Sequence, residues 1–426
     1  MATTTKTLPP RLVDFLPPSS AAPRTPFWDA HGRCHWLAAP PGQVLEEWQA
    51  GEHVGDESRD FLDLIEMLLC GHITGARLRR QRACQQMLEV VLDGGESWYV
   101  RRMLRRQADD PEADLVSERL LREANLLLWL RHHSTIPVPF VVRATPEFSV
   151  LRRMPGKPVR ECWGTFDRQQ KETVVISYAQ YTTETFDLNV PEAVGSTSGG
   201  TTGTGQILWP APFMGRGPAR LAPMVYSSVQ ELIDYVFSAA LAEACATAPN
   251  DAVQEERAHL LGILHRAANA STCVVPPGAC STLTHDGADD GDIIVHEHTG
   301  EVTGVIDWEY HALVPRVLAA CYPAWLRYDG VHDPRFARPG RWWLAPREEA
   351  LEMRALFEEV VKSKSQSYYD ALRDGAGLRS NLEWVYEMGT EDYWGRLRRW
   401  MVSRRMLPQD EKAGGVKKQT STMFTS

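Results

Sequence analysis

Acidic side chains gather in one short stretch of the chain, and another acid follows two apolar segments later. Four aspartates share the seven residues after His285, namely Asp286, Asp289, Asp290 and Asp292. Asp307 ends the apolar run 302–306, where a buried carboxylate without a partner would be costly. Magnesium prefers a few carboxylates combined with phosphate oxygens. The pattern therefore indicates a magnesium-dependent phosphoryl-transfer site, with a solvated acidic loop as the alternative.

Two short strands are predicted to position these acids. Apolar residues at 293–296 indicate one strand, His298-Thr-Gly300 a hairpin turn, and 302–306 a second strand that ends on Asp307. Because the two strands of a hairpin are antiparallel, the acidic turn and Asp307 are expected at the same end of it.

Other segments predict a strand-rich first half and a helical second half. Strands are expected at 87–92 and 98–103, around the turn Asp93-Gly-Gly95, and at 148–152. Apolar spacing predicts helices over 60–69, 111–131, 168–188, 228–246, 251–269, 347–362 and 380–388. The Gly-, Ser- and Thr-rich segment 195–206 is expected to be a flexible loop. A two-lobed α+β architecture follows.

Several motifs, in a fixed order between residues 80 and 330, resemble the aminoglycoside phosphotransferase and choline kinase family. The stretch 283–295 followed by Ile306-Asp-Trp-Glu309 resembles its pattern H-G-D-L-x-x-x-N-I-L-V, then I-D-W-E. The remaining motifs are Trp98-Tyr-Val-Arg101, Glu123 on the next helix, the helix end with Ile136-Pro-Val-Pro139, the segment 151–158 with Trp163, and Pro315-Arg-Val-Leu-Ala-Ala320, which is similar to the fungal branch of the family.

This resemblance implies a protein-kinase-like fold with a small antiparallel-sheet N-lobe and a larger, mainly helical C-lobe. The expected divisions are a disordered tail at 1–25, the N-lobe at 26–155, the C-lobe at 156–408 and a second disordered tail at 409–426. The implied activity is phosphorylation of a hydroxyl or amine on a small-molecule acceptor, with ATP and Mg²⁺.

The resemblance also implies roles for individual residues. The expected sets are Arg101 and Glu123 for the nucleotide phosphates, Asp292 and Asp307 for Mg²⁺, and His285, Asp286 and Asp289 for catalysis. Arg102 is the alternative to Arg101 if the strand register differs by one residue. Tyr322, Trp325, Trp342, Trp343 and Trp384 are available to line an acceptor pocket, with packing in the core as the alternative.

The chain departs from the family pattern at the position of the catalytic aspartate. Gly287 occupies it, Asp286 stands where the family has glycine, and Asp292 replaces the metal-binding asparagine. A glycine cannot accept or orient a proton, so Asp286 or Asp289 would have to serve the acceptor. Loss of a general base typically reduces a rate by about 10²–10⁴.

Three functions therefore stay open. The first is an ATP- and Mg²⁺-dependent phosphotransferase. The second is a pseudokinase-type binding or accessory protein, which Gly287 and the glycine-poor, arginine-rich segment 75–86 favour. The third is a kinase-fold enzyme repurposed in the biosynthesis of small molecules such as secondary metabolites.

Composition excludes several other classes of protein. A net charge of −9 over 426 residues argues against a nucleic-acid surface, and the arginine run at 101–106 has no aromatic residues between the arginines. No apolar run approaches the roughly 20 residues of a membrane span, and no secretory signal is recognisable, so a cytoplasmic protein is expected.

Two other metal-binding patterns are disfavoured by the sequence. The eight cysteines form no CxxC pair. An EF-hand at 286–297 fails because Ala288 and Ile294 occupy ligand positions.

Overall fold

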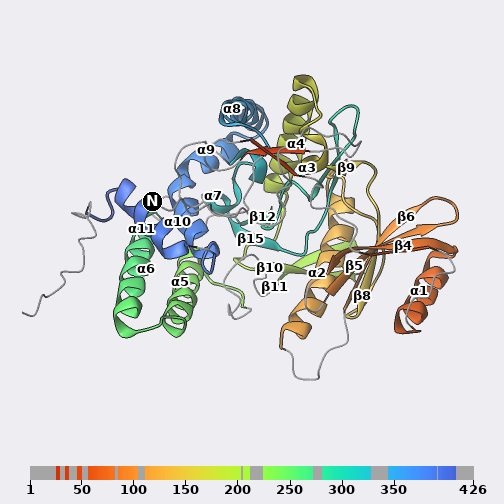
Figure 1. Cartoon of the computed structure of the whole chain (residues 1–426), viewed down its shortest axis with the longest axis horizontal. Coiled ribbons are helices and arrows are strands. Elements are labelled where there is room, and N and C mark those ends of the chain that lie inside the picture. The colour runs from red at the N-terminus through yellow and green to blue at the C-terminus, as the bar shows by residue number, and fades with distance from the viewer. Residues whose placement is uncertain are drawn as a thin grey trace, which may run out of the picture.

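The computed structural model describes residues 25–28, 34–37, 46–49, 56–81, 85–103, 111–202, 205–211, 224–271, 281–327, 344–390 and 392–408. Of the tails predicted to be disordered, 1–25 and 409–426, all residues except Thr25 lie outside the described residues, as do Trp342 and Trp343. Thr25 begins strand β1 (Thr25–Trp28). Figure 1 shows a sheet flanked by α1 and α2 at the right and most of the remaining helices to the left of it. The predicted α+β fold with two lobes is confirmed.

The N-lobe is a six-stranded antiparallel sheet in the order β3-β4-β5-β6-β8-β7. Its strands are β3 (Glu46–Gln49), β4 (Ile73–Gln81), β5 (Gln85–Leu92), β6 (Ser97–Met103), β7 (Val141–Ala144) and β8 (Phe148–Arg152). Helix α1 (Asp56–Leu69) and helix α2 (Pro111–His133) accompany the sheet. The predicted strands at 87–92, 98–103 and 148–152 and the helices at 60–69 and 111–131 are confirmed.

Alternation along the strands places the two helices on opposite faces of this sheet. Phe148 and Val150 of β8 belong to the core under α1, where Phe61 meets Phe148 edge-on at 5.7 Å. Leu151, one residue further on, belongs to the core that contains the apolar face of α2. Successive strand residues point to opposite faces, so the side facing α2 is also the side that faces the C-lobe core.

The C-lobe is helical around two small pairs of strands. Its longer helices are α4 (Arg168–Asp187), α5 (Val229–Ala246), α6 (Asp251–Ser271), α8 (Arg347–Lys364), α9 (Gln366–Asp374), α10 (Ala376–Tyr386) and α11 (Tyr393–Ser403). Strand β12 (Ser281–His285) pairs with β15 (His311–Pro315), and β13 (Ile293–Val295) pairs with β14 (Val302–Val305). The core of this lobe includes three almost fully buried tryptophans, Trp163, Trp308 and Trp384.

Short elements connect the lobes and fix the hairpin β13–β14. Strand β9 (Lys157–Pro158) pairs with β13 and leads into α3 (Val159–Cys162). Gly156 has φ +109°, and a Cβ there would lie 2.3 Å from the carbonyl oxygen of Val295. Only glycine permits this approach, so the segment between the lobes is held directly against the acid-bearing hairpin. The lobe boundary at 155/156 stays a prediction.

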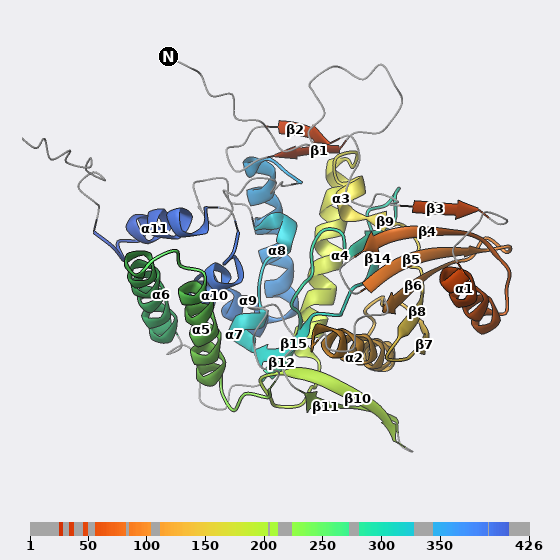
Figure 2. The same ribbon diagram turned by 60° about the horizontal axis from the view of Figure 1, so that its bottom comes forward.

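The segment 195–206 is not the flexible loop that its composition predicts. It forms most of the hairpin β10 (Ser196–Thr202) and β11 (Gly205–Ala211), which lies beside α2 (Figure 2). Gly199 allows this approach, because a Cβ there would lie 3.0 Å from the Cβ of Asn125. Backbone bonds of 3.0 and 2.7 Å between Gly195 and Leu313 join the hairpin to β15. Tertiary contacts therefore override a local composition that is typical of loops.

Candidate active site

One arginine links the two lobes through two buried carboxylates. Arg101 Nη1 donates to Glu123 Oε2 at 2.5 Å, and Arg101 Nη2 donates to Asp307 Oδ1 at 2.7 Å. The exposed fractions of the three side chains are only 6%, 2% and 13% for Arg101, Glu123 and Asp307. The planar fork of a guanidinium suits such paired contacts. Strand β6, helix α2 and the end of β14 are thus connected at one point.

The direction of β6 decides between the two arginines that the sequence left open. Val100 and Arg102 point to the α1 face, where the Arg102 guanidinium lies 5.1 Å from the ring centre of Phe61. Arg101 points to the α2 face and reaches Glu123. Although burial opposes its charge, Glu123 and Asp307 raise the pKa of Arg101, so it is a permanent cation. Arg101, and not Arg102, therefore faces Glu123, and its role toward nucleotide phosphates stays a prediction.

Asp292 and Asp307 form a crowded pair of acids. Burial, followed by the charges of Asp289 and Asp307, raises the pKa of Asp292 well above its usual range. A cation between the two carboxylates would relieve this repulsion. In the described part of the chain, no group of three or more His, Cys, Asp or Glu side chains could hold a metal. Two carboxylates are fewer ligands than an all-protein metal site needs, and Mg²⁺ at such a pair would take its remaining ligands from phosphate oxygens and water.

Asp289 is tied to a residue that sequence reasoning missed. Arg160 of α3 donates to Asp289 Oδ1 at 2.6 Å and to Asp290 Oδ1 at 2.8 Å. The backbone N–H of Gly291 also donates to Asp289 Oδ1, at 2.6 Å, and a Cβ on Gly291 would lie 2.6 Å from Arg160 Cζ. Asp289 therefore fixes the shape of the turn. No local pattern marks Arg160, which lies 129 residues earlier in the chain.

His285 connects the acidic turn to the strand that carries Asp307. Its Nε2 lies 2.9 Å from the carbonyl oxygen of Ile306, and its ring packs at 4.6 Å on Trp308. Burial lowers the pKa of His285, so the ring is neutral and Nε2–H donates to this carbonyl. The structure thus places His285 where it orients the two carboxylate segments relative to each other.

Tyr310 covers the position of the missing aspartate. A Cβ on Gly287 would lie 3.3 Å from Tyr310 Cβ and 3.5 Å from its Cδ2. Arg119 of α2 holds the tyrosine, with Nη1 donating to the hydroxyl at 3.2 Å and the guanidinium 4.9 Å from the ring centre. The smallest residue at position 287 is therefore matched to a large neighbour.

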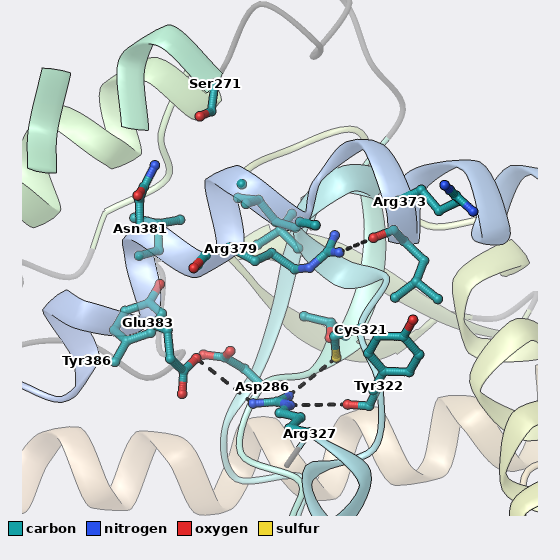
Figure 3. A pocket seen from close by; sticks show the side chains of 18 of the residues that line it. Ser271, Asp286, Cys321, Tyr322, Arg327, Arg373, Arg379, Asn381, Glu383 and Tyr386 are labelled. Carbon is teal, nitrogen blue, oxygen red and sulfur yellow. Dashed lines mark hydrogen bonds and ion pairs between the residues drawn. The ribbon is translucent and has the colours of Figure 1, made fainter. Parts of the chain in front are cut away.

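Asp286 faces a cavity of about 880 Å³ in the C-lobe, which it lines together with Thr284 and His285 (Figure 3). Of the aromatic residues considered for a pocket, Tyr322 lines this cavity, whereas Trp325 and Trp384 are core residues with 3% and 0% exposure. Sequence reasoning missed Tyr386, Trp400 and the arginines that line it. They come from helices far apart in the chain, and no motif marks them.

None of the helices in the described part of the chain is long and apolar enough to cross a membrane. No protein-family model matches the sequence. The chain is 31% identical over 394 residues to Clavilactone A biosynthesis cluster protein Y of Ampulloclitocybe clavipes, covering 90% of this chain and 96% of that protein.

Comparison with solved structures found small-molecule phosphotransferases. A ternary complex of streptomycin, ATP and APH(2")-IIa matches with a TM-score of 0.49 and 9% identity, over 83% of this chain and 97% of that one. Macrolide 2'-phosphotransferase type I matches with a TM-score of 0.46 and 12% identity, over 82% of this chain and 98% of that one.

Similarity to this relative assigns the chain to a family. The relative is similar along nearly the whole of both chains. The ordered motifs converge on the Arg101–Glu123–Asp307 network between a sheet lobe and a helical lobe. This chain belongs to the family of Clavilactone A biosynthesis cluster protein Y.

Proposed function

We propose that this chain is an ATP- and Mg²⁺-dependent phosphotransferase that acts on a hydroxyl or amine of a small molecule. The observation that carries the proposal is the position of the turn 286–292, whose first residue lines a cavity and whose last residue lies near Asp307. Asp286 lines a cavity of about 880 Å³, large enough for a small molecule. Asp292, at the other end of the turn, is close enough to Asp307, the partner of Arg101, for the Asp307 charge to raise its pKa.

On the nucleotide side, Arg101 supplies a fixed positive charge for phosphate oxygens. Glu123 holds the guanidinium on one side, so its direction is set before a nucleotide binds. Asp292 and Asp307 would hold Mg²⁺, which neutralises charge on the phosphates when it is bound. His285 keeps the turn next to the strand end that carries Asp307.

On the acceptor side, Asp286 is the carboxylate in a position to receive a proton from the acceptor. The acceptor oxygen or nitrogen forms a bond to the γ-phosphorus, and the bond from that phosphorus to the bridging β–γ oxygen breaks. The proton passes to Asp286 and then to solvent, and ADP leaves. Because positioning and electrostatics dominate phosphoryl transfer, a displaced carboxylate still supports it.

The relative suggests the setting of the reaction. Its name assigns that protein to the cluster for clavilactone A biosynthesis. By analogy, the acceptor of this chain is proposed to be a product or intermediate of small-molecule biosynthesis.

A second function is favoured by the packing of Tyr310 against Gly287. If this position must remain blocked, the chain binds a nucleotide or a small molecule without transferring phosphate, as an accessory protein would.

Calorimetric titration of ATP, with and without Mg²⁺, tests the proposal. Binding is expected to require Mg²⁺, to be lost in Asp307→Ala, and to persist in Asp286→Asn, because Asp286 faces the acceptor cavity. Asp60→Ala, at an exposed position of α1, is the matched control. Single-turnover transfer from γ-labelled ATP to a panel of hydroxyl and amine acceptors then separates the two functions. If ATP does not bind in a Mg²⁺-dependent way, neither a phosphotransferase nor a nucleotide-binding accessory protein is supported. If ATP binds but no phosphate is transferred or hydrolysed, the accessory role is favoured.

A further inference from the structure

The cavity beside Asp286 carries an excess of positive charge. Its described lining includes five arginines, Arg327, Arg354, Arg373, Arg379 and Arg404. Only three acids line it, Asp286, Glu358 and Glu383. This surplus is local, because the chain as a whole has a net charge of −9.

Among the described residues, few carboxylates lie close to these arginines. Arg327 lies 3.9 Å from Glu383 and also contacts Cys321 Sγ and the carbonyl oxygen of Tyr322 (Figure 3). The other four arginines have no carboxylate oxygen of a described residue within 4.0 Å. Folded proteins seldom leave several cations around one cavity without counter-charges unless a ligand supplies them.

Arg379 shows the imbalance most clearly. Within the described residues, its guanidinium donates to three backbone carbonyls, those of Val317, Ala371 and Leu372. Burial lowers the pKa of Arg379, and the nearby Arg327 acts in the same direction. The carbonyl dipoles satisfy its hydrogen bonds but leave a full positive charge at the edge of the cavity.

Arg354 and Arg373 present their charge next to aromatic rings. The Arg354 guanidinium lies 4.2 Å from the ring centre of Tyr322, whose hydroxyl donates to Glu358 at 2.5 Å. Arg373 Nη1 donates to the hydroxyl of Tyr369 at 3.0 Å, and Arg373 also interacts electrostatically with Glu358. A guanidinium that stacks on a ring keeps its N–H edge available for a planar anion.

The remaining lining suits the body of an organic molecule. Leu232, Leu318, Leu382 and Trp400 contribute apolar surface. Asn381 also lines the cavity, is 6% exposed, and makes no side-chain hydrogen bond to a described residue. An apolar cavity with a few converging polar groups is the usual form of a small-molecule site.

We propose that this cavity binds a small organic carboxylate, with its anionic group against Arg354 and Arg373 and its hydroxyl toward Asp286. That this carboxylate is the phosphate acceptor rests on the proposed function. Its binding to the cavity does not require a nucleotide. The same charge surplus disfavours a polycationic acceptor.

Three probes with the same ring and hydroxyl but different charge test the proposal: 4-hydroxyphenylacetate, its methyl ester and tyramine. Binding to the full chain is measured by ligand-observed NMR and calorimetry, without nucleotide or Mg²⁺. The carboxylate is expected to bind about threefold to tenfold more tightly than the ester, and tyramine weakest, because Arg373 is exposed and Arg354 is half-buried, so that solvent screens the added charge pair. Arg354→Gln and Arg373→Gln are each expected to reduce this preference.

Arg168→Gln is the matched control, since Arg168 is an exposed arginine of α4 that pairs with Glu172 at 2.8 Å and Glu352 at 3.2 Å and does not line the cavity. Thermal unfolding of each variant checks its fold, and Arg354→Lys, which keeps the charge, should retain the preference if Arg354→Gln unfolds. Equal or stronger binding of tyramine, no binding of the carboxylate, or a preference unchanged in both glutamine variants would overturn the proposal. If the carboxylate binds but no nucleotide does, the proposed function is refuted and this inference stands. If nucleotide binds but the carboxylate does not, this inference is refuted and the proposed function stands.

Discussion

Replacing Arg101 by methionine should expose the energetics of the link between the lobes. In the folded protein, the change leaves Glu123 and Asp307 without their cation while their side chains stay 2% and 13% exposed. Breaking a buried ion pair by removing one partner typically destabilises a protein by about 3–5 kcal/mol. We expect Arg101→Met to lower the free energy of unfolding by an amount in this range.

A neighbouring residue and a compensated variant sharpen the prediction. Arg102→Met removes the next side chain of the same strand, which lies on the other face and bonds to Gln86 at 2.8 Å. It should cost about 1 kcal/mol or less, as do most partly exposed polar contacts. Adding Glu123→Met and Asp307→Asn to Arg101→Met should recover most of the loss, because no buried charge is then left without a counter-charge.

Urea denaturation at pH 7, followed by circular dichroism, measures all four proteins, and unchanged m-values would show that the unfolded states are comparable. If Arg101→Met cost no more than Arg102→Met, the Arg101 contacts would not stabilise the fold, and the argument for a preset phosphate-facing cation would fail.

Three further predictions concern stability. Burial lowers the pKa of His311 to about 4 from its usual 6.5, so the unfolded chain binds one more proton than the folded protein between these pH values. The free energy of unfolding should therefore rise by about 3 kcal/mol from about pH 4 to 6.5 because of this group. His311→Gln should remove this contribution when denaturation is measured over the same pH range. Gly156→Ala should destabilise by about 1–3 kcal/mol, because of its positive φ and the Val295 carbonyl, whereas Gly94→Ala, with open space around it, should be nearly neutral in thermal unfolding. Gly287→Asp should destabilise the fold by about 1–3 kcal/mol by crowding Tyr310, whose Cβ is the nearest atom. A double-mutant cycle with Tyr310→Gly, which removes that Cβ, should show a coupling of at least about 0.5 kcal/mol, and additivity would contradict the contact.

The helices and strands with a clear apolar period were predictable within a few residues. Helix α4 was expected at 168–188 and spans Arg168–Asp187, where Asp167 caps it by accepting from the backbone N–H of Gln170 at 2.9 Å. Segments without such a period were not predictable. The hairpin β10–β11 exists because Gly199 admits α2 and because buried Ser196 and Thr197 bond to His311, contacts that span more than 110 residues.

The residues of the candidate site were likewise predictable only in part. The resemblance to a known family singled out Arg101, Glu123, Asp292 and Asp307, and the structure brings Arg101, Glu123 and Asp307 into contact. The roles of these residues stay predictions. The resemblance did not decide whether Arg101 or Arg102 faces inward, since a shift of one residue reverses the face of a strand.

The sequence by itself determined the two-lobed fold class and the kinds of side chain that meet between the lobes, because periodicity and motif spacing are local properties. Only the tertiary structure decided that Arg101 joins Glu123 to Asp307, that Arg160 holds Asp289, and that Tyr310 covers Gly287. It also decided that arginines from α8 to α11 surround one cavity. These contacts join residues distant in the chain, and they depend on how loops and helix ends pack, which no local pattern records.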